Sequence, residues 1–473
     1  MAIIAYSLLA CTCHAIQSVY PSYGSIGKAS GSEGGSTIDG SNGGLHIFRE
    51  NSAGLSSHNA IYKVRRASAA QMHVVIFTLK ERNMDVLKSV LHQVSDPRSK
   101  RYGDYMTKQE VNDLTTNPDS YSEIMEYLHA SGAEALHDGS TRDFIMARAP
   151  VSTWERMLDT VFNVYSVEDK EQSVKNGDAK MQTFIRSEKY SVPSSLHKHI
   201  GVILNTIQLP PSMAQAHLSV KKTKKTKKNE TWPSTIFSGG ESNTLMTPKR
   251  LNEVYNIDDN TGHPKATQAI CGGTDSYFSA EDVTSFQGQF DLPLQSLNQS
   301  FGNHSISSAW CISNSIYPCV YGNLQIQYMM AMCTSPTILY HSDYLTHSSW
   351  LREIYNSPNT PLVATIVDTY YEDQLSYNEV EDFENWAVKL GVIGVTVVVA
   401  SGDDGASLSP EVDIILGTDI SPSSQCSYAS TFPASCPYVL TVGATQVCIF
   451  LYYIPIKSLL TSDYYTYAYY VGS

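Results

Sequence analysis

The chain has 473 residues, of which 42% are hydrophobic and 17% are charged, and its formal net charge is −13. This apolar content excludes a chain that is disordered throughout, because disordered chains are poor in apolar and aromatic residues. The sequence has no internal run of about 18 uncharged, mainly apolar residues, so we predict no membrane span and exclude a polytopic membrane protein.

The two halves of the chain differ in charge. Residues 1–240 contain 23 acidic and 27 basic residues, whereas residues 241–473 contain 23 acidic and 6 basic residues. The formal charges are therefore +4 and −17. The densest basic run, 221–228, is short and has no aromatic residue, which favours a solvated linker over a localisation signal or a nucleic-acid patch. We predict no nucleic-acid partner, because such a partner needs a basic face on a folded domain.

Residues 1–15 have features of a secretory signal peptide. Ala2–Ala10 is apolar and Ala15 is a small residue that suits signal peptidase, although the basic start of such segments is missing. The alternative interpretation is a disordered start. We predict a cleaved signal peptide.

The cysteines and glycosylation sequons agree with passage through an oxidising compartment. Seven of the nine cysteines lie beyond residue 270, and their spacing contains no zinc-binding pair, so disulfides are the expected use. Because seven is odd, one thiol of this set has no partner within it. Three Asn-x-Ser/Thr sequons occur, at Asn229, Asn298 and Asn303. We expect a glycoprotein of the secretory pathway, either extracellular or in the lysosome or vacuole.

The first predicted domain follows a linker. Residues 16–69 are rich in Ser and Gly, which is typical of a flexible linker. Residues 70–212 alternate between strand and helix patterns, which predicts a two-layer α+β sandwich. The expected strands cover His73–Leu79 and Arg142–Arg148, and the expected helices follow Asn83, Asp119 and Ser152.

A second linker, 213–245, precedes a region of different character, 246–446. Here we expect an α/β fold with buried strands over Thr267–Cys271 and Leu362–Val367 and an amphipathic helix over Asn378–Leu390. Val395–Ala400 is continuously apolar, as in a central parallel strand, and it runs into a Gly-rich turn with carboxylates. The Tyr-rich residues 447–473 show neither helical nor strand periodicity, and we interpret them as an aberrant tail, as a gene-model error would produce.

Five motifs in consistent order carry a resemblance to one family. They are VSDPRSKRYGDYMTKQEV (94–111), MTPKRLNEVYN (246–256), NLQIQY (323–328), VASGDDGA (399–406) and FPASCPYVLTVGAT (432–445). Together they resemble the sedolisin family of serine-carboxyl peptidases with its pro-kumamolisin-type prodomain. The resemblance extends from about residue 70 to residue 446.

The resemblance implies a fold and a chemistry. The implied fold class is α/β: a subtilisin-like parallel-sheet peptidase domain, incomplete here, preceded by an α+β sandwich prodomain. The implied activity is that of tripeptidyl peptidases or endopeptidases at acid pH, with peptides or proteins as substrates. Glutamate replaces histidine as the base of a Ser-Glu-Asp triad, because imidazole would be protonated at acid pH. An additional aspartate, which must be protonated to donate a hydrogen bond, supports the oxyanion hole.

Carried over residue by residue, the triad fails to match. The triad Glu falls on Tyr321 and the triad Asp on Gln325, and neither side chain is a base at acid pH. Residues 292–342 contain no Asp or Glu, so we expect no nearby carboxylate to substitute. The nucleophile motif S-G-T-S-x-S is not found after Thr445, and neither is the calcium segment of the family, so we expect no cofactor. The oxyanion aspartate matches Asp403, for which a plain turn carboxylate is the alternative interpretation.

Three functions remain open: an active zymogen, a pseudopeptidase that binds peptides or partner proteases, and a prodomain that acts alone as folding aid or inhibitor. Tyr321 and Gln325 favour the last two, so we predict a chain that is inactive as written. We further expect the prodomain and the peptidase domain to contact each other through their opposite charges and to separate as carboxylates become protonated. The second half alone is not expected to form a stable monomer, because its sheet would expose an edge and an apolar face.

Overall fold

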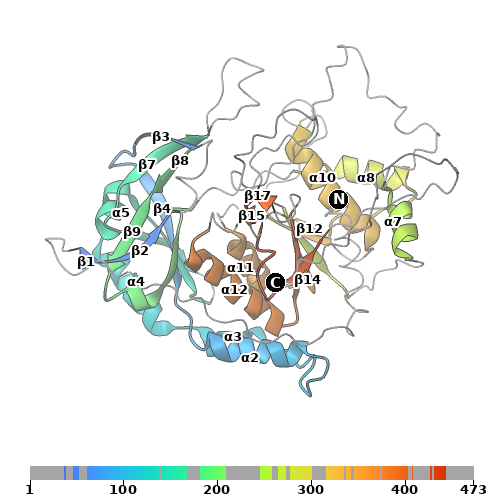
Figure 1. Cartoon of the computed structure of the whole chain (residues 1–473), viewed down its shortest axis with the longest axis horizontal. Coiled ribbons are helices and arrows are strands. Elements are labelled where there is room, and N and C mark those ends of the chain that lie inside the picture. Colours follow the sequence, from blue (N-terminus) through green and yellow to red (C-terminus); the bar gives the residue numbers. More distant parts are fainter. Residues whose placement is uncertain are drawn as a thin grey trace, which may run out of the picture.

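The computed structural model describes residues 37–38, 46–52, 61–138, 141–167, 182–208, 246–257, 265–272, 277–300, 316–334, 337–341, 346–367, 369–371, 375–402, 407–408, 427–428 and 431–443. The expected signal peptide, the whole 213–245 linker, Asp403, Asn229, Asn303 and the tail lie outside these residues. We call the described residues up to 208 the N-terminal lobe and those from 246 the C-terminal lobe. Figure 1 shows the first in blue to green and the second in yellow to red. Among the described residues, no helix is long and apolar enough to cross a bilayer.

The centre of the N-terminal lobe is a four-stranded antiparallel sheet. Its strand order is β10 (Ile200–Leu204), β4 (Met72–Leu79), β6 (Phe144–Pro150) and β5 (Glu134–Asp138). Helices α4 (Pro118–Ala130) and α5 (Val151–Met157) pack on it, because Leu128 and Trp154 share a buried core with Phe77 and Ile145. The strands predicted near residues 73 and 142 and the helices predicted after residues 83, 119 and 152 are confirmed.

Two smaller antiparallel sheets complete the N-terminal lobe. One contains β3 (Ile61–Arg66), β7 (Phe162–Val167) and β8 (Gln182–Ser187), and the other contains β1 (Thr37–Ile38), β2 (His46–Asn51) and β9 (Lys189–Pro193). Strands β1, β2 and β3 therefore lie within the stretch 16–69 that composition predicts to be a linker. The Ser- and Gly-rich composition ends at Gly44, and apolar residues such as Ile47 then allow strand pairing with β9.

A six-stranded parallel sheet forms the C-terminal lobe. Its order is β12 (Gln299–Ser300), β13 (Thr337–His341), β11 (Gln268–Gly272), β14 (Val363–Ile366), β16 (Thr396–Ala400) and β20 (Leu440–Val442). Every neighbouring pair is parallel. The apolar run predicted as a central parallel strand is confirmed as β16, which lies between β14 and β20.

Helices cover both faces of this sheet, since successive side chains of a strand point to opposite faces. On one face, Ala269 and Val397 pack against Trp386 and Leu390 of α12 (Tyr377–Val392), beside α11 (His347–Asn356). On the other face, Ile270 packs against α8 (Ala280–Gln289) and α10 (Ile316–Met332). Helix α7 (Pro248–Tyr255) adjoins α10.

The two lobes share one apolar core. Leu87 of α2 (Met84–Ser95) and Val111 of α3 (Lys108–Thr115) are fully buried in the same cluster as Trp386 and Leu390 of α12. Figure 1 shows α2 and α3 lying next to α12. The N-terminal lobe therefore completes the hydrophobic packing of the C-terminal lobe.

Candidate functional site

The strands of the six-stranded parallel sheet point to one carboxyl edge, and α/β proteins build their sites at such an edge. Beyond β16, the main-chain N–H of Ser401 donates to the Val442 carbonyl at 3.1 Å, and the Thr431 hydroxyl donates to the Ser401 carbonyl at 2.9 Å. Gly402 has φ +84°, and a β-carbon there would lie 3.2 Å from the Thr431 methyl group. These contacts fix the direction of the chain as it leaves β16 toward Asp403, which itself lies outside the described residues.

Both mismatched triad positions lie in α10, as their spacing predicts. The side chain of Tyr321 is outside the described part of the structure, whereas Gln325 is 1% exposed. The Gln325 Nε2 group finds no hydrogen-bond partner among the described residues. A buried amide without a partner destabilises a fold by about 1–3 kcal/mol, and a carboxamide does not ionise. Gln325 therefore supplies neither an acid nor a base.

A carboxylate from another helix lies beside α10, although residues 292–342 themselves contain no Asp or Glu. Asp282 in the first turn of α8 accepts a hydrogen bond from Asn323 Nδ2 at 2.9 Å through Oδ2, and its carbonyl accepts from Gln327 Nε2 at 3.3 Å. The Asn323 Oδ1 atom in turn accepts from the Ser279 N–H at 2.9 Å. Asp282 thus links α8 to α10, although it lies outside the motif at residues 323–328. The helix-start pattern at Ser279 places Asp282 in a first turn, but only the packing shows which helix it contacts.

The backbone of α10 at Gly322 closely approaches the backbone of Tyr277, which precedes α8. Gly322 lies one residue after Tyr321, and a β-carbon there would overlap the carbonyl oxygen of Tyr277. Only glycine fits at such a contact, because it has no side chain.

The exposed Asn298 sequon precedes β12. Among the described residues, no group of three or more His, Cys, Asp and Glu side chains lies close enough together to hold a metal ion.

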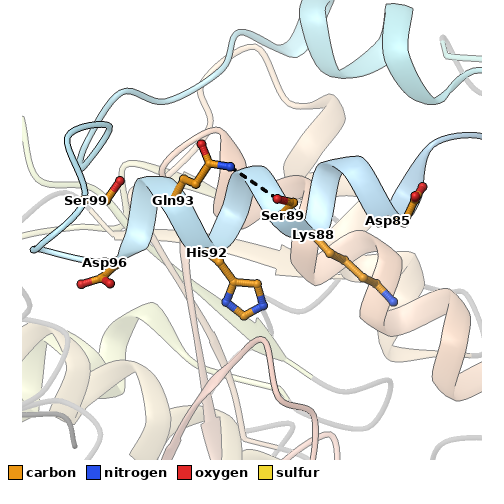
Figure 2. Close-up of a pocket in the computed structure, with 7 residues that line it drawn as sticks. All are labelled: Asp85, Lys88, Ser89, His92, Gln93, Asp96 and Ser99. Carbon is orange, nitrogen blue, oxygen red and sulfur yellow. Dashed lines mark hydrogen bonds between the residues drawn. The ribbon is translucent and has the colours of Figure 1, made fainter. Parts of the chain in front are cut away.

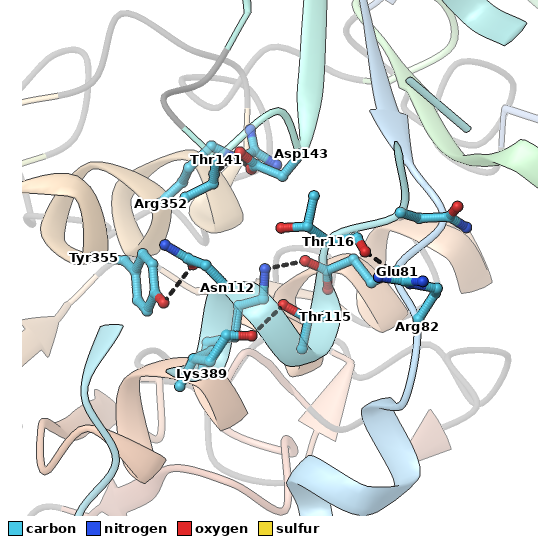
Figure 3. A network of polar contacts seen from close by, with 12 residues as sticks. Glu81, Arg82, Asn112, Thr115, Thr116, Thr141, Asp143, Arg352, Tyr355 and Lys389 are labelled. Atoms are coloured by element: carbon cyan, nitrogen blue, oxygen red, sulfur yellow. Dashed lines mark hydrogen bonds and ion pairs between the residues drawn. The ribbon is translucent and has the colours of Figure 1, made fainter. Parts of the chain in front are cut away.

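A cluster of buried charged side chains lies between the lobes. The Lys389 ammonium group forms an ion pair with Glu81, and Arg352 lies 3.1 Å from Asp143 Oδ2 and 3.5 Å from Asp382 Oδ2. Figure 3 shows Glu81 and Asp143 of the N-terminal lobe opposite Lys389 and Arg352. Burial raises the pKa of Glu81 and that of Asp382, and the neighbouring cations oppose this effect only in part.

Further hydrogen bonds join the two lobes beside this charged cluster. The Tyr355 hydroxyl donates to Asn112 Oδ1 at 2.8 Å (Figure 3), and the Lys108 ammonium group donates to the Ser357 carbonyl at 2.6 Å. The main-chain N–H of Met106 donates to the carbonyl of Val392 at 2.9 Å. Each of these bonds joins one lobe to the other.

A second contact lies at the start of α12. Asn378 donates to Glu50 of β2, and the other Glu50 oxygen accepts from the Tyr190 hydroxyl. Next to it, burial raises the pKa of Glu379 to about 8, and burial lowers the pKa of Arg186 to about 9. Strand β2 therefore takes part in the lobe contact, which composition alone did not predict.

A surface hollow of about 610 Å³ runs along α2, far from the carboxyl edge of the sheet. Figure 2 shows that its lining side chains, among them Lys88, His92 and Asp96, all come from α2 and the turn after it. Ligand sites are usually concave, largely apolar and lined by several elements. We therefore do not place the functional site in this hollow.

Comparison with known proteins agrees with the architecture described above. Residues 59–209 match the family described as Pro-kumamolisin, activation domain. Tripeptidyl-peptidase 1 of Rattus norvegicus is 27% identical over 383 residues, which cover 78% of this chain and 61% of the relative. Tripeptidyl-peptidase 1 of Homo sapiens is 25% identical over 396 residues, which cover 80% and 63% of the two chains. The chain is a relative of the sedolisin peptidases.

The match locates the activation domain of this sedolisin relative. The match begins at residue 59, just before β3, and ends at residue 209, after β10. The chain spans about 61% of the length of the rat relative. Among solved structures, a Pseudomonas sedolisin complexed with two molecules of pseudo-iodotyrostatin is 19% identical, covers 42% of this chain and 53% of its own, and has a TM-score of 0.28. That likeness is too low to support a structural argument.

Proposed function

We propose that this chain is a sedolisin-family homologue that binds peptides through its peptidase-like lobe and does not cut them. The observation that carries the proposal is Gln325, which the motif aligns with the triad aspartate and whose buried Nε2 group finds no hydrogen-bond partner among the described residues. Tyr321, at the position of the triad glutamate, has a phenol of ordinary pKa about 10 and accepts no proton at acid pH. With neither group ionised, the two positions that carry the triad acids in the family provide no base for a serine nucleophile.

The experiment is covalent labelling of the purified full chain by a fluorophosphonate probe between pH 3 and pH 5. The expected result is no labelling and no release of tripeptides from a fluorogenic substrate. The matched control is Asp403→Asn, which removes the expected oxyanion carboxyl. If the unmodified chain were labelled and Asp403→Asn were not, the chain would be an active peptidase and the proposal would be wrong.

Peptide binding needs a separate measurement. A fluorescein-labelled octapeptide with a free amino terminus is expected to raise its polarisation when the full chain is added at pH 4.5. The unlabelled peptide should compete, and the amino-terminally acetylated peptide should compete less if the tripeptidyl-type preference is retained. Absence of any polarisation change would refute peptide binding.

The second candidate function is that of the activation domain itself, as folding aid or inhibitor of a partner peptidase. The shared core supports it, because Leu87 and Val111 of the activation domain are buried in one cluster with residues of α11 and α12. The corresponding test adds the chain to an active tripeptidyl peptidase at pH 4.5. A fall in that activity would favour this function over peptide binding.

We further propose that the protein enters the secretory pathway and resides outside the cell or in the lysosome or vacuole. Two facts support this proposal: Asn298 is exposed, and Cys319 and Cys333 are disulfide-bonded. Cys319 and Cys333 lie 14 residues apart near the two ends of α10, about 20 Å at the helical rise, so they are not bonded to each other. Endoglycosidase treatment that shifts the mass of the native protein would test this proposal.

A further inference from the structure

The interface between the activation domain and the peptidase-like lobe holds more carboxyl groups than cations. Glu81 and Asp143 from one side and Asp382 from the other surround Arg352 and Lys389. When all five groups are ionised, the cluster carries one excess negative charge. The side chains of Arg352 and Lys389 are 7% and 2% exposed, so water screens this charge poorly.

Both cations have additional partners that do not titrate. The Arg352 guanidinium lies 4.8 Å from the ring centre of Phe144 and 5.2 Å from that of Trp386. The Lys389 ammonium lies 4.1 Å from the ring centre of Trp386 and 5.9 Å from that of Tyr355. Cations over aromatic faces are stabilised by the ring quadrupole. Protonation of one carboxyl therefore leaves neither cation without a partner.

Most of the remaining interface is insensitive to pH. Leu87 and Val111 are buried against Trp386, and the Met106 N–H donates to the Val392 carbonyl. Such contacts keep their strength when carboxylates become neutral, because they carry no ionisable group. Among the ion pairs that join the lobes, Lys80 with Glu381 is the more exposed one, and surface pairs contribute at most about 1 kcal/mol.

We infer that the activation domain of this protein stays docked at acid pH, and that its interface becomes tighter as the buried carboxyl groups take up a proton. This inference is the opposite of the expectation from net charge, according to which the two halves of the chain, with formal charges of +4 and −17, separate on acidification. Overall charge acts through solvent and is screened, whereas the buried cluster acts at contact. The inference goes beyond the proposed function, because it concerns retention of the activation domain and not peptide cutting.

The protonation behaviour of the buried acids agrees with this geometry. The pKa values of Glu81 and Asp382 are raised mainly by burial, with Asp143 adding like charge to both. A carboxyl whose pKa is higher in the docked state binds more protons there than when undocked. Docking therefore strengthens as pH falls through the raised pKa toward the ordinary value near 4.5, and it is constant below that value. Tyr355 also faces Glu81, and its own pKa is raised, so the phenol stays neutral throughout.

The same behaviour is found where β2 meets the start of α12. Burial raises the pKa of Glu379 to about 8, and the charged groups that face it are Glu50, Asp382 and Arg186. Two of these three neighbours are acids, so a proton on Glu379 removes repulsion. Acidification thus favours the packed state at both contact regions.

The experiment cuts the connection between the lobes without separating them beforehand. A site for a sequence-specific protease is inserted in the full chain between residues 213 and 245, the folded protein is cut, and size-exclusion chromatography is run at pH 7.5 and pH 4.5. The expected result is co-elution of both fragments at both pH values, with a dissociation constant at pH 4.5 no larger than at pH 7.5. Separation of the fragments at pH 4.5 but not at pH 7.5 would overturn the inference.

Two variants and a second readout connect the result to the cluster. Glu81→Gln imitates the protonated acid, so its fragments should dissociate at pH 7.5 as slowly as those of the unmodified protein at pH 4.5. Glu381→Gln, in the more exposed pair, should keep the pH dependence of the unmodified protein. If Glu81→Gln does not fold, amide hydrogen exchange of the unmodified full chain decides. Met106 should stay protected at both pH values, and its selective loss of protection at pH 4.5 would overturn the inference. Probe labelling and peptide polarisation are independent of this outcome.

Discussion

Glu379 gives the sharpest test of how burial sets the pH dependence of this fold. It is the third residue of the capping box that begins α12: Ser376 Oγ accepts from the Glu379 N–H at 3.3 Å, and Glu379 Oε2 accepts from the Ser376 N–H at 3.1 Å. Its side chain is buried beside Glu50. Substitution by Gln keeps an oxygen that accepts the same hydrogen bond and removes the ionisable proton, since Glu and Gln both serve in capping boxes.

The expected magnitude follows from the pKa. Burial raises the pKa of Glu379 from 4.5 to about 8. A raised pKa contributes stability that is fully present below the unfolded value and is lost as pH rises toward the folded value. Each pH unit in this window corresponds to about 1.4 kcal/mol, so between pH 5 and pH 7 the carboxyl should lower the free energy of unfolding by about 2.5 kcal/mol. Glu379→Gln should lack this loss and be the more stable protein at pH 7.

The assay is urea unfolding of the full chain at pH 5, 6 and 7, followed by tryptophan fluorescence, for the unmodified protein and Glu379→Gln. The difference between the two free energies of unfolding should increase in favour of Gln as pH rises. Glu381→Gln is the matched control in the same helix, because it removes only the Lys80 pair, which is worth at most about 1 kcal/mol. If the curves of Glu379→Gln and the unmodified protein ran parallel over this range, the assignment of a buried, neutral Glu379 would be wrong.

Three further substitutions test the packing. Arg352→Met should leave two buried carboxylates without their cation and destabilise the chain by about 3–5 kcal/mol in urea unfolding at pH 7; an unchanged midpoint would show that the cluster is solvated. Gly322→Ala should lower the stability by about 2 kcal/mol or more through overlap with Tyr277, whereas Gly288→Ala, with no atom within 4 Å of the added β-carbon, should be neutral or stabilising; equal effects would refute the close approach. Thr107→Ala should remove the capping box of α3 and lower the free energy of unfolding by about 1 kcal/mol, and a loss below about 0.3 kcal/mol would contradict it.

The candidate site shows where sequence reasoning succeeded and where it failed. The i, i+4 spacing of Tyr321 and Gln325 predicted one helix, and α10 contains both. Residues 292–342 contain no Asp or Glu, and the carboxylate that contacts α10 comes from outside this segment. Asp282 reaches Asn323 from another helix, 41 residues away along the chain. A contact of this kind depends on how two helices pack, and no local pattern encodes it.

The sequence by itself determined the secondary structure of the longer elements and the family. Apolar runs and helical periodicity predicted β4, β16 and α12, because burial of one face imposes a period on the residues that form it. Composition was misleading over residues 16–69, where β1, β2 and β3 form in a stretch predicted to be a linker, and β2 is stabilised by pairing with β9.

Only the tertiary structure decided how the two lobes recognise each other. Glu81 and Lys389 are 308 residues apart, and net charge predicted their attraction without the burial that governs their protons. The number of charges can be counted in a sequence, but the dielectric environment of each charge depends on which surfaces exclude water. That environment makes the buried carboxyls favour docking in acid, whereas the overall charge of the halves favours separation.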